Sequence, residues 1–194
     1  MPFLKNWVKE AEDAGLIRRF QRLAEKSGIA VPRMLISESD YPAAHAVSII
    51  RPSVIVTRGL LNKLETTELD AVLTHELIHI RRRDALLTIM LGLLNVLQVF
   101  NPFAGLMVKL ATREREKVCD AEATRITGDP LSLASGLLKI ARDRTMQATE
   151  SAVGGSVAER IAAVMDHGNY SRKSYAWLFL LTIAVTAALL LSIC

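Results

Sequence analysis

The chain has 194 residues, about half of them hydrophobic and only 5% aromatic, with a formal net charge of +4. This length suits one domain with a hydrophobic core, and the composition excludes a disordered chain and a disulfide scaffold. The basic residues lie beside apolar runs without interleaved aromatic residues, which favours the cytoplasmic face of a membrane over nucleic acid as a partner. Two cysteines in different surroundings, Cys119 and Cys194, fit a reducing compartment.

The first part of the chain predicts helices followed by a small sheet. Apolar residues recur at helical spacing through residues 3–27, which predicts one or two helices, and Gly28 is a typical helix end. Beyond Pro32, three short runs rich in β-branched residues are separated by turn residues and predict strands. These runs are residues 34–37, 45–50 and 54–57. Residues 59–64 predict a short helix that leads into the next segment.

Residues 66–83 predict a helix in the interior of the protein. Apolar side chains cover most of its girth, and Thr66 and Thr67 offer an N-cap. Three arginines, Arg81 to Arg83, place positive charge at the end that the helix dipole favours. A buried helix seldom carries histidine and glutamate unless these groups have partners, so its polar residues are candidates for a functional site.

His75 and His79 lie four residues apart on this predicted helix. Both imidazoles therefore point to the same side, one turn apart, and can bind one metal ion. Glu76 stands beside them, where it can accept a proton from a water molecule on the metal. This is the His-Glu-x-x-His arrangement of zinc hydrolases, in which the ion polarises a carbonyl and lowers the pKa of its water. A chance occurrence on a surface helix is the alternative.

Residues 85–108 are mostly apolar and are broken by Asn101 and Pro102. If His75, His79 and a later acid bind one ion, this segment must leave and return on the same side of any membrane. Its first arm has 16 residues, about 24 Å as a helix, which is shorter than a hydrocarbon core of roughly 30 Å. We expect a helical hairpin between the metal motifs, either entering the membrane or packed on the domain as ordinary core helices.

A polar helix predicted at residues 112–123 supplies candidates for the third ligand. By chemistry the candidates are Glu114, Glu116, Asp120 and Glu122. Glu116 and Asp120 share a helix face with Cys119 and Ala123, which are small enough to pack against the metal helix. Spacing alone does not choose among the four acids, and a solvated run of charge is the alternative for each of them.

Residues 130–165 predict two more helices. Residues 130–141 and 158–165 have apolar residues at helical spacing. Gly154 and Gly155 lie between them and predict a loop or linker.

A membrane anchor is predicted at the C-terminus. Residues 177–194 contain no charge over 18 positions, about 27 Å as a helix, and aromatic and basic residues precede them. The expected organisation is a domain at residues 1–170 followed by a transmembrane anchor at residues 171–194, although a buried C-terminal helix is the alternative.

Several stretches of the sequence together carry a family resemblance. Residues 50–84, which include Thr-His-Glu-Leu-Ile-His, resemble the core block of that family, and residues 116–120 resemble the motif with its glutamate ligand. Residues 100–102 resemble its hairpin turn, and residues 129–134 and 159–161 resemble weaker stretches. The chain thus resembles the membrane-associated zinc metallopeptidases of the M48 and M56 (gluzincin) kind, most of all the M56 protease domain of β-lactam-sensing receptors.

The resemblance implies a zincin-like metallopeptidase domain of the α+β class, mainly helical, with a small sheet and a hairpin between the metal motifs. It implies that His75, His79 and Glu116 bind one zinc ion per chain and that Glu76 is the general base. Asp120 would be a partner that orients a ligand. The resemblance leaves the group that stabilises the oxyanion unassigned.

The expected function is hydrolysis of peptide bonds by a zinc-dependent endopeptidase at the cytoplasmic face of the inner membrane. Its partners would be a protein or peptide substrate, bound along an edge strand at residues 45–50, and the lipid bilayer. The alternative is a signalling or regulatory membrane module whose zinc domain relays a signal or is mainly structural. Structural zinc sites have four protein ligands, so three ligands and an adjacent glutamate favour the enzyme.

Overall fold

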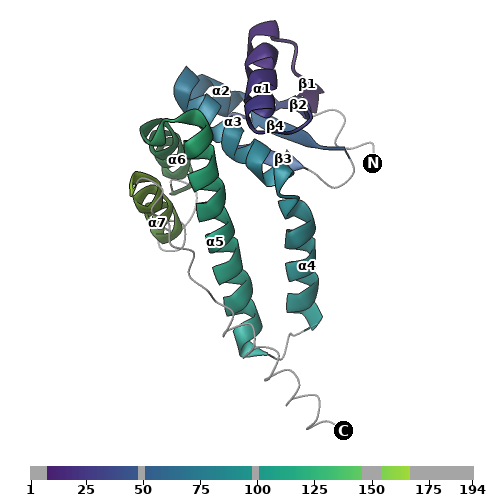
Figure 1. Ribbon diagram of the computed structural model, residues 1–194, viewed down its shortest axis with the longest axis vertical. Coiled ribbons are helices and arrows are strands. Elements are labelled where there is room, and N and C mark those ends of the chain that lie inside the picture. The colour runs from purple at the N-terminus through teal and green to yellow at the C-terminus, as the bar shows by residue number, and fades with distance from the viewer. Residues whose placement is uncertain (1–7, 48–50, 98–100, 146–153, 167–194) are drawn as a thin grey trace.

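The fold combines a small sheet with helices that pack on it and on one another (Figure 1). The computed structural model describes residues 8–47, 51–97, 101–145 and 154–166. The strands are β1 (Val8–Glu10), β2 (Arg33–Ser37), β3 (Ala44–Val47) and β4 (Ser53–Thr57). The helices are α1 (Ala14–Lys26), α2 (Arg58–Lys63), α3 (Thr66–Arg81), α4 (Asp84–Leu97), α5 (Pro102–Thr127), α6 (Pro130–Thr145) and α7 (Gly154–Met165). The expected α+β class, mainly helical with a small sheet, is confirmed.

The sheet has the strand order β1-β2-β4-β3. β2 and β4 are parallel, and the two outer strands pair with them in antiparallel fashion. Val54 and Val56 of β4 are fully buried, whereas β3 lies at an edge of the sheet and beside α3. The three predicted strands are confirmed, except that residues 48–50 lie outside the described residues.

The first helix is shorter than the apolar spacing predicts. Residues 8–10 form β1, antiparallel to β2, at a place where a helix is predicted. α1 begins after Asp13, whose side chain accepts hydrogen bonds from the backbone N–H groups of Gly15 and Leu16 at 2.7 and 3.0 Å. This N-cap fixes the start of the helix and leaves the preceding residues to pair with the sheet. Gly28, with φ +71°, follows the end of α1 as expected.

α3 is the central helix, in contact with α1, β3, α5 and α6. Most of its apolar side chains are buried, as predicted, but its N-cap is Glu65, one residue before the predicted Thr66. The backbone N–H of Glu65 donates to the Glu68 carboxylate at 2.9 Å. Glu68 also accepts hydrogen bonds from Ser135 and Lys139 of α6, at 2.5 and 2.7 Å. This buried carboxylate therefore ties α6 to the first turn of α3.

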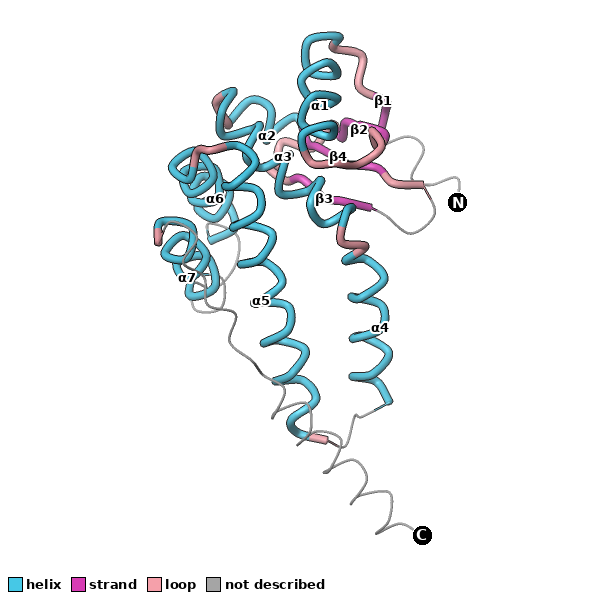
Figure 2. The backbone as a smooth tube through the Cα atoms, viewed as in Figure 1, coloured by secondary structure: helices cyan, strands magenta, loops and turns pink. Residues whose placement is uncertain are grey.

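α4 and the first half of α5 form the predicted hairpin, which projects away from the sheet (Figure 2). Asn101 caps α5 by accepting a hydrogen bond from the backbone N–H of Phe103 at 3.0 Å, with Pro102 in the first turn. α5 then continues without a break to Thr127, so the polar segment 112–123 is part of this helix and not a separate one. No helix within the described ranges is both long and apolar enough to cross a bilayer.

α6 and α7 pack beside α3 and α5. Gly136 of α6 lies so close to α3 that a Cβ atom there would be 3.2 Å from Cγ2 of Val72, so glycine permits this close approach. α7 begins at Gly154, where a linker is predicted, because packing against α5 and α6 overrides the low helix propensity of glycine. The anchor expected at residues 171–194 lies outside the described residues.

Candidate metal centre

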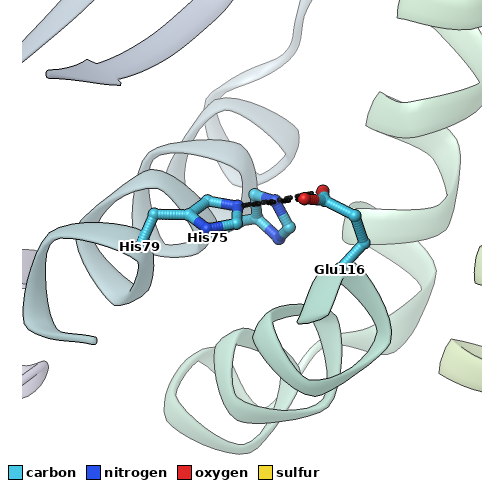
Figure 3. Close-up of side chains that lie close together, drawn as sticks. All are labelled: His75, His79 and Glu116. Carbon is cyan, nitrogen blue, oxygen red and sulfur yellow. Dashed lines mark hydrogen bonds and ion pairs between the residues drawn. The ribbon is translucent and has the colours of Figure 1, made fainter. Parts of the chain in front are cut away.

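Two helices bring three potential metal ligands to one point (Figure 3). His75 and His79 project from one side of α3, and Glu116 projects toward them from α5. The Nε2 atoms of His75 and His79 are 3.0 Å apart. The Glu116 carboxylate lies 3.5 Å from Nε2 of His75 and 3.8 Å from Nε2 of His79. The chain therefore folds so that all three donors face one another.

Each imidazole has a carboxylate at its other nitrogen. Nδ1 of His75 lies 2.9 Å from Oδ1 of the buried Asp120 and forms an ion pair with it when the imidazole is protonated. Nδ1 of His79 is hydrogen-bonded to Oδ2 of Asp84, the first residue of α4, at 2.7 Å. Arg83, with φ +56°, turns the chain between α3 and α4. Carboxylates in these positions orient the rings and leave Nε2 available to a metal.

The donor set fits zinc. Zinc binds imidazole nitrogen and carboxylate oxygen at about 2.0–2.2 Å, so neighbouring donors of a tetrahedral site lie ~3.3 Å apart. The separations here, from 3.0 to 3.8 Å, bracket that value. Two imidazole nitrogens and a carboxylate this close together in a buried site need a proton or a cation between them. The arrangement is therefore suited to a cation with three protein ligands.

The charges around the centre favour binding of a cation. Burial lowers the pKa of His75, but the charge of Asp120 and the close contacts with the carboxylates of Asp120 and Glu116 outweigh it and raise this pKa to about 9. Burial raises the pKa of Glu116, but His75 and His79 outweigh it and lower this pKa to about 2. The centre thus stabilises a positive charge between ionised carboxylates, which is the place that a dication takes.

Glu76 lies beside the histidines and contacts the edge of the sheet. The backbone N–H of Ala46 in β3 donates a hydrogen bond to Oε2 of Glu76 at 2.7 Å. Burial raises the pKa of Glu76 to about 7, against the opposing effects of the His75 charge and the Ala46 hydrogen bond. A carboxyl group that titrates near neutrality can both accept and return a proton.

The structure distinguishes between the four acidic residues that are candidates for the third ligand. Glu116 alone of the four joins the two Nε2 atoms, and Asp120 contacts the far side of one imidazole. Glu114 pairs with a lysine three residues along the same helix, and Glu122 pairs with two arginines at the end of α3. The placement of Glu116 and Asp120 agrees with the positions that the family resemblance implies.

The centre opens into a cavity of about 300 Å³. Its walls come from β3 and from helices α3 to α7. The three potential ligands, Glu76 and Arg160 all line it. A substrate in this cavity would therefore meet the potential ligands and the acidic group together.

Comparison with models of protein families shows which family the chain belongs to. The family model described as BlaR1 peptidase M56 matches residues 6–164, more than four fifths of the sequence. The chain belongs to the M56 peptidase family. The match covers all the site residues described above and confirms the resemblance found in the sequence.

Curated relatives named Protease HtpX homolog are also similar to this M56 chain. That of Gemmatimonas aurantiaca is 31% identical over 197 residues, covering 83% of this chain and 71% of the relative. That of Acidiphilium cryptum is 35% identical over 158 residues, covering 64% and 55%. That of Pyrococcus furiosus is 32% identical over 168 residues, covering 69% and 58%. The M56 chain thus spans 55% to 71% of the length of these relatives.

Arg160 of α7 belongs to the site of this M56 chain, although the sequence alone gives it no role. Its guanidinium donates two hydrogen bonds to Asp120, both of 2.7 Å. Nη2 also lies 3.4 Å from Nε2 of His75, and Nη1 lies 3.6 Å from Glu116. Arg160 therefore holds the carboxylate that orients His75. The only signal for it is its place in the weakly similar stretch 159–161.

The thiol of Cys119 packs behind His79. Its Sγ atom is 3.5 Å from Nδ1 of His79 and 3.5 Å from Oδ2 of Asp84, and the residue is fully buried. Burial raises the pKa of this thiol, which keeps it protonated in the metal-free protein. The packed thiol is as expected. Asp84 is a further site residue that the sequence left without a role, and its only signal is one acid directly after three arginines.

Proposed function

We propose that this M56 chain is a zinc-dependent endopeptidase that hydrolyses peptide bonds of protein substrates at the cytoplasmic face of the inner membrane. The observation that supports the proposal is the convergence of His75, His79 and Glu116, with Glu76 beside them in the wall of a cavity. Within the described part of the chain, three protein donors meet at this point. Three donors favour a catalytic site with an open position over a structural site closed by four.

The roles of the residues follow from their positions. When bound, zinc polarises the scissile carbonyl and acidifies a water molecule. Glu76 accepts a proton from the attacking water and then gives it to the leaving amine. Its contact with Ala46 places its carboxylate at the edge of β3, along which the peptide would lie as an added strand. Asp84 and Asp120 hold the two imidazoles in place.

Zinc removal tests the proposal directly. We expect the purified protein to carry one zinc ion and to cleave members of an unstructured peptide library. Cleavage should stop with 1,10-phenanthroline, continue with the non-chelating 1,7 isomer, and return when zinc is added back. Zinc-loaded protein that cleaves no peptide, or a zinc ion with a fourth side chain as ligand, would favour the structural module instead.

The hairpin supports the membrane location. Its large apolar side chains that are exposed are Leu86, Leu87, Ile89, Met90, Leu93, Val96, Phe103 and Leu106. No charged residue occurs between Asp84 and Lys109, and basic residues at 81–83 and Arg113 flank this run, which suits anionic head groups. We propose that the hairpin enters one side of the bilayer without crossing it, since α4 is only about 21 Å long. The domain at residues 1–170 would also be held by an anchor at residues 171–194.

Fluorescent labelling of the hairpin tip tests its contact with lipid. The variant Val96→Cys in a Cys194→Ser background would carry an environment-sensitive dye at the exposed position 96. The remaining cysteine, Cys119, is fully buried and should not react with the dye. With vesicles that contain phosphatidylglycerol, we expect a blue shift and quenching by nitroxides on the acyl chains. The matched control is Leu131→Cys on α6, also exposed, which should show neither change. A blue shift at position 96 without quenching would indicate contact with protein and would contradict the proposal.

A further inference from the structure

Arg115 of α5 lines the cavity directly before the third potential ligand in the chain. Its side chain is only 13% exposed. Nη2 lies 3.5 Å from Oε1 of Glu116, and Nη1 donates a hydrogen bond of 2.6 Å to Oγ1 of Thr88 on α4. The buried Nε lies 3.9 Å from Oδ2 of Asp84. One guanidinium group thus contacts both the metal centre and the first residues of the hairpin.

The two oxygens of the Glu116 carboxylate each face one imidazole and one arginine. Oε2 lies 3.5 Å from Nε2 of His75 and 3.6 Å from Nη1 of Arg160. Oε1 lies 3.8 Å from Nε2 of His79 and 3.5 Å from Nη2 of Arg115. The carboxylate is therefore held on both sides, and turning it away from the imidazoles would also break its contacts with the two arginines.

Arg115 also lies beside the carboxylate that supports His79. Oδ2 of Asp84 is hydrogen-bonded to Nδ1 of His79 at 2.7 Å, and the same oxygen is the one nearest to Nε of Arg115 in their ion pair. Arg115 can therefore act on two potential ligands, directly on Glu116 and through Asp84 on His79. A planar guanidinium presents donors in several fixed directions at once, which an ammonium group does not.

The contact with Thr88 connects this arrangement to the hairpin. Thr88 lies four residues after Asp84, and its hydroxyl donates a hydrogen bond of 2.9 Å to the backbone carbonyl of Asp84. The hydroxyl oxygen is thereby oriented to accept the hydrogen bond from Arg115. Arg115 thus joins α5 to the first turn of α4 at the level of the metal centre.

We infer that Arg115 is a positioning residue, which bridges α5 and α4 and so holds Glu116 and His79 in the arrangement that suits a zinc ion. The inference rests on the three-ligand centre of the proposed function. It depends on the shape of the guanidinium group as well as on its charge, because the three contacts lie in different directions. Loss of a group that orients a ligand typically costs about 10- to 100-fold in metal affinity.

Metal binding by the full chain tests the inference without peptide cleavage. Competition with a chromophoric chelator measures the zinc affinity, and the visible absorption of the cobalt-loaded protein reports the ligand geometry. Arg115→Met should weaken zinc binding by about 10- to 100-fold and change the cobalt spectrum. Arg115→Lys keeps the charge without the planar fork, so it should restore only part of the affinity. Thr88→Val keeps the shape without the hydroxyl and should weaken binding less than Arg115→Met does.

Arg113→Met is the matched control. Arg113 lies two residues earlier on α5, pairs with Glu159 of α7 and does not line the cavity, so this variant should keep the wild-type affinity and cobalt spectrum. Arg115→Lys and Thr88→Val change few atoms, so they decide the matter even if Arg115→Met does not fold.

Three results would overturn the inference and leave the proposed function intact. They are wild-type affinity in Arg115→Met, full restoration of affinity by Arg115→Lys, and an equal loss of affinity in Arg113→Met. Failure of the wild-type protein to bind zinc or cobalt would overturn the proposed function and the inference together.

Discussion

Replacing Glu76 with glutamine is expected to lower kcat for peptide cleavage by about 10²- to 10⁴-fold while the protein keeps its zinc. Glutamine has the same shape, and its amide oxygen can still accept the hydrogen bond from the Ala46 N–H. The amide cannot take a proton from the attacking water, so only the acid–base contribution is removed. Steady-state cleavage of a fluorogenic peptide measures kcat, and atomic emission measures the zinc content.

Glu25→Gln provides the matched control for this variant. Glu25 is exposed on α1, away from the residues that line the cavity, and the substitution changes charge and shape in the same way. We expect it to cleave at the wild-type rate. Full zinc content together with wild-type kcat in Glu76→Gln would show that Glu76 is not the general base. Loss of zinc from Glu76→Gln would contradict its assignment as a group that does not bind the metal.

Glu116→Ala is expected to weaken zinc binding by more than ~100-fold and thereby to abolish cleavage. Loss of an outer carboxylate that orients a ligand typically costs 10- to 100-fold in affinity, and this variant removes a proposed direct ligand. The two imidazoles of α3 would remain, held by Asp84 and Asp120, so some zinc affinity should persist. Competition with a chromophoric chelator gives the affinity of the variant and of the wild type.

Glu114→Ala is the matched control, because it also removes a glutamate carboxylate from α5, two residues before Glu116. Glu114 pairs with Lys117 and is not among the three converging donors, so this variant should keep its zinc. Release of zinc from Glu114→Ala or Glu122→Ala, combined with retention in Glu116→Ala, would show that the third ligand is misassigned.

The sequence predicts α3 well because its pattern is local. The apolar girth of the helix and the four-residue spacing of His75 and His79 depend only on helix geometry. The start of the helix was predicted less well. Several residues can act as an N-cap, and the capping box between Glu65 and Glu68, three residues later, decides between them in the folded chain.

The residue pattern does not predict features that depend on contacts between segments far apart in the sequence. β1 exists because residues 35–37 offer it a partner strand, which apolar spacing cannot reveal. Spacing left four acids open as third ligands, and the family resemblance implied the one that the fold brings to the histidines. Arg160 contacts His75, which lies 85 residues earlier in the chain. Arg160 lies on α7, and the two glycines at the start of this helix predict a linker instead of a helix. Its role therefore emerges only from tertiary structure.

The position of the three potential ligands on both sides of the hairpin has a mechanical consequence. Metal binding at His79 and Glu116 would cross-link residues that are 37 positions apart and close the whole hairpin into a loop. If the cross-link restricted the unfolded chain as a disulfide does, the chain-entropy relation would give about 4 kcal/mol of stabilisation. The same coordination bonds would then also fix the base of the apolar hairpin, so the metal-free chain would be looser at the hairpin that we propose to contact lipid.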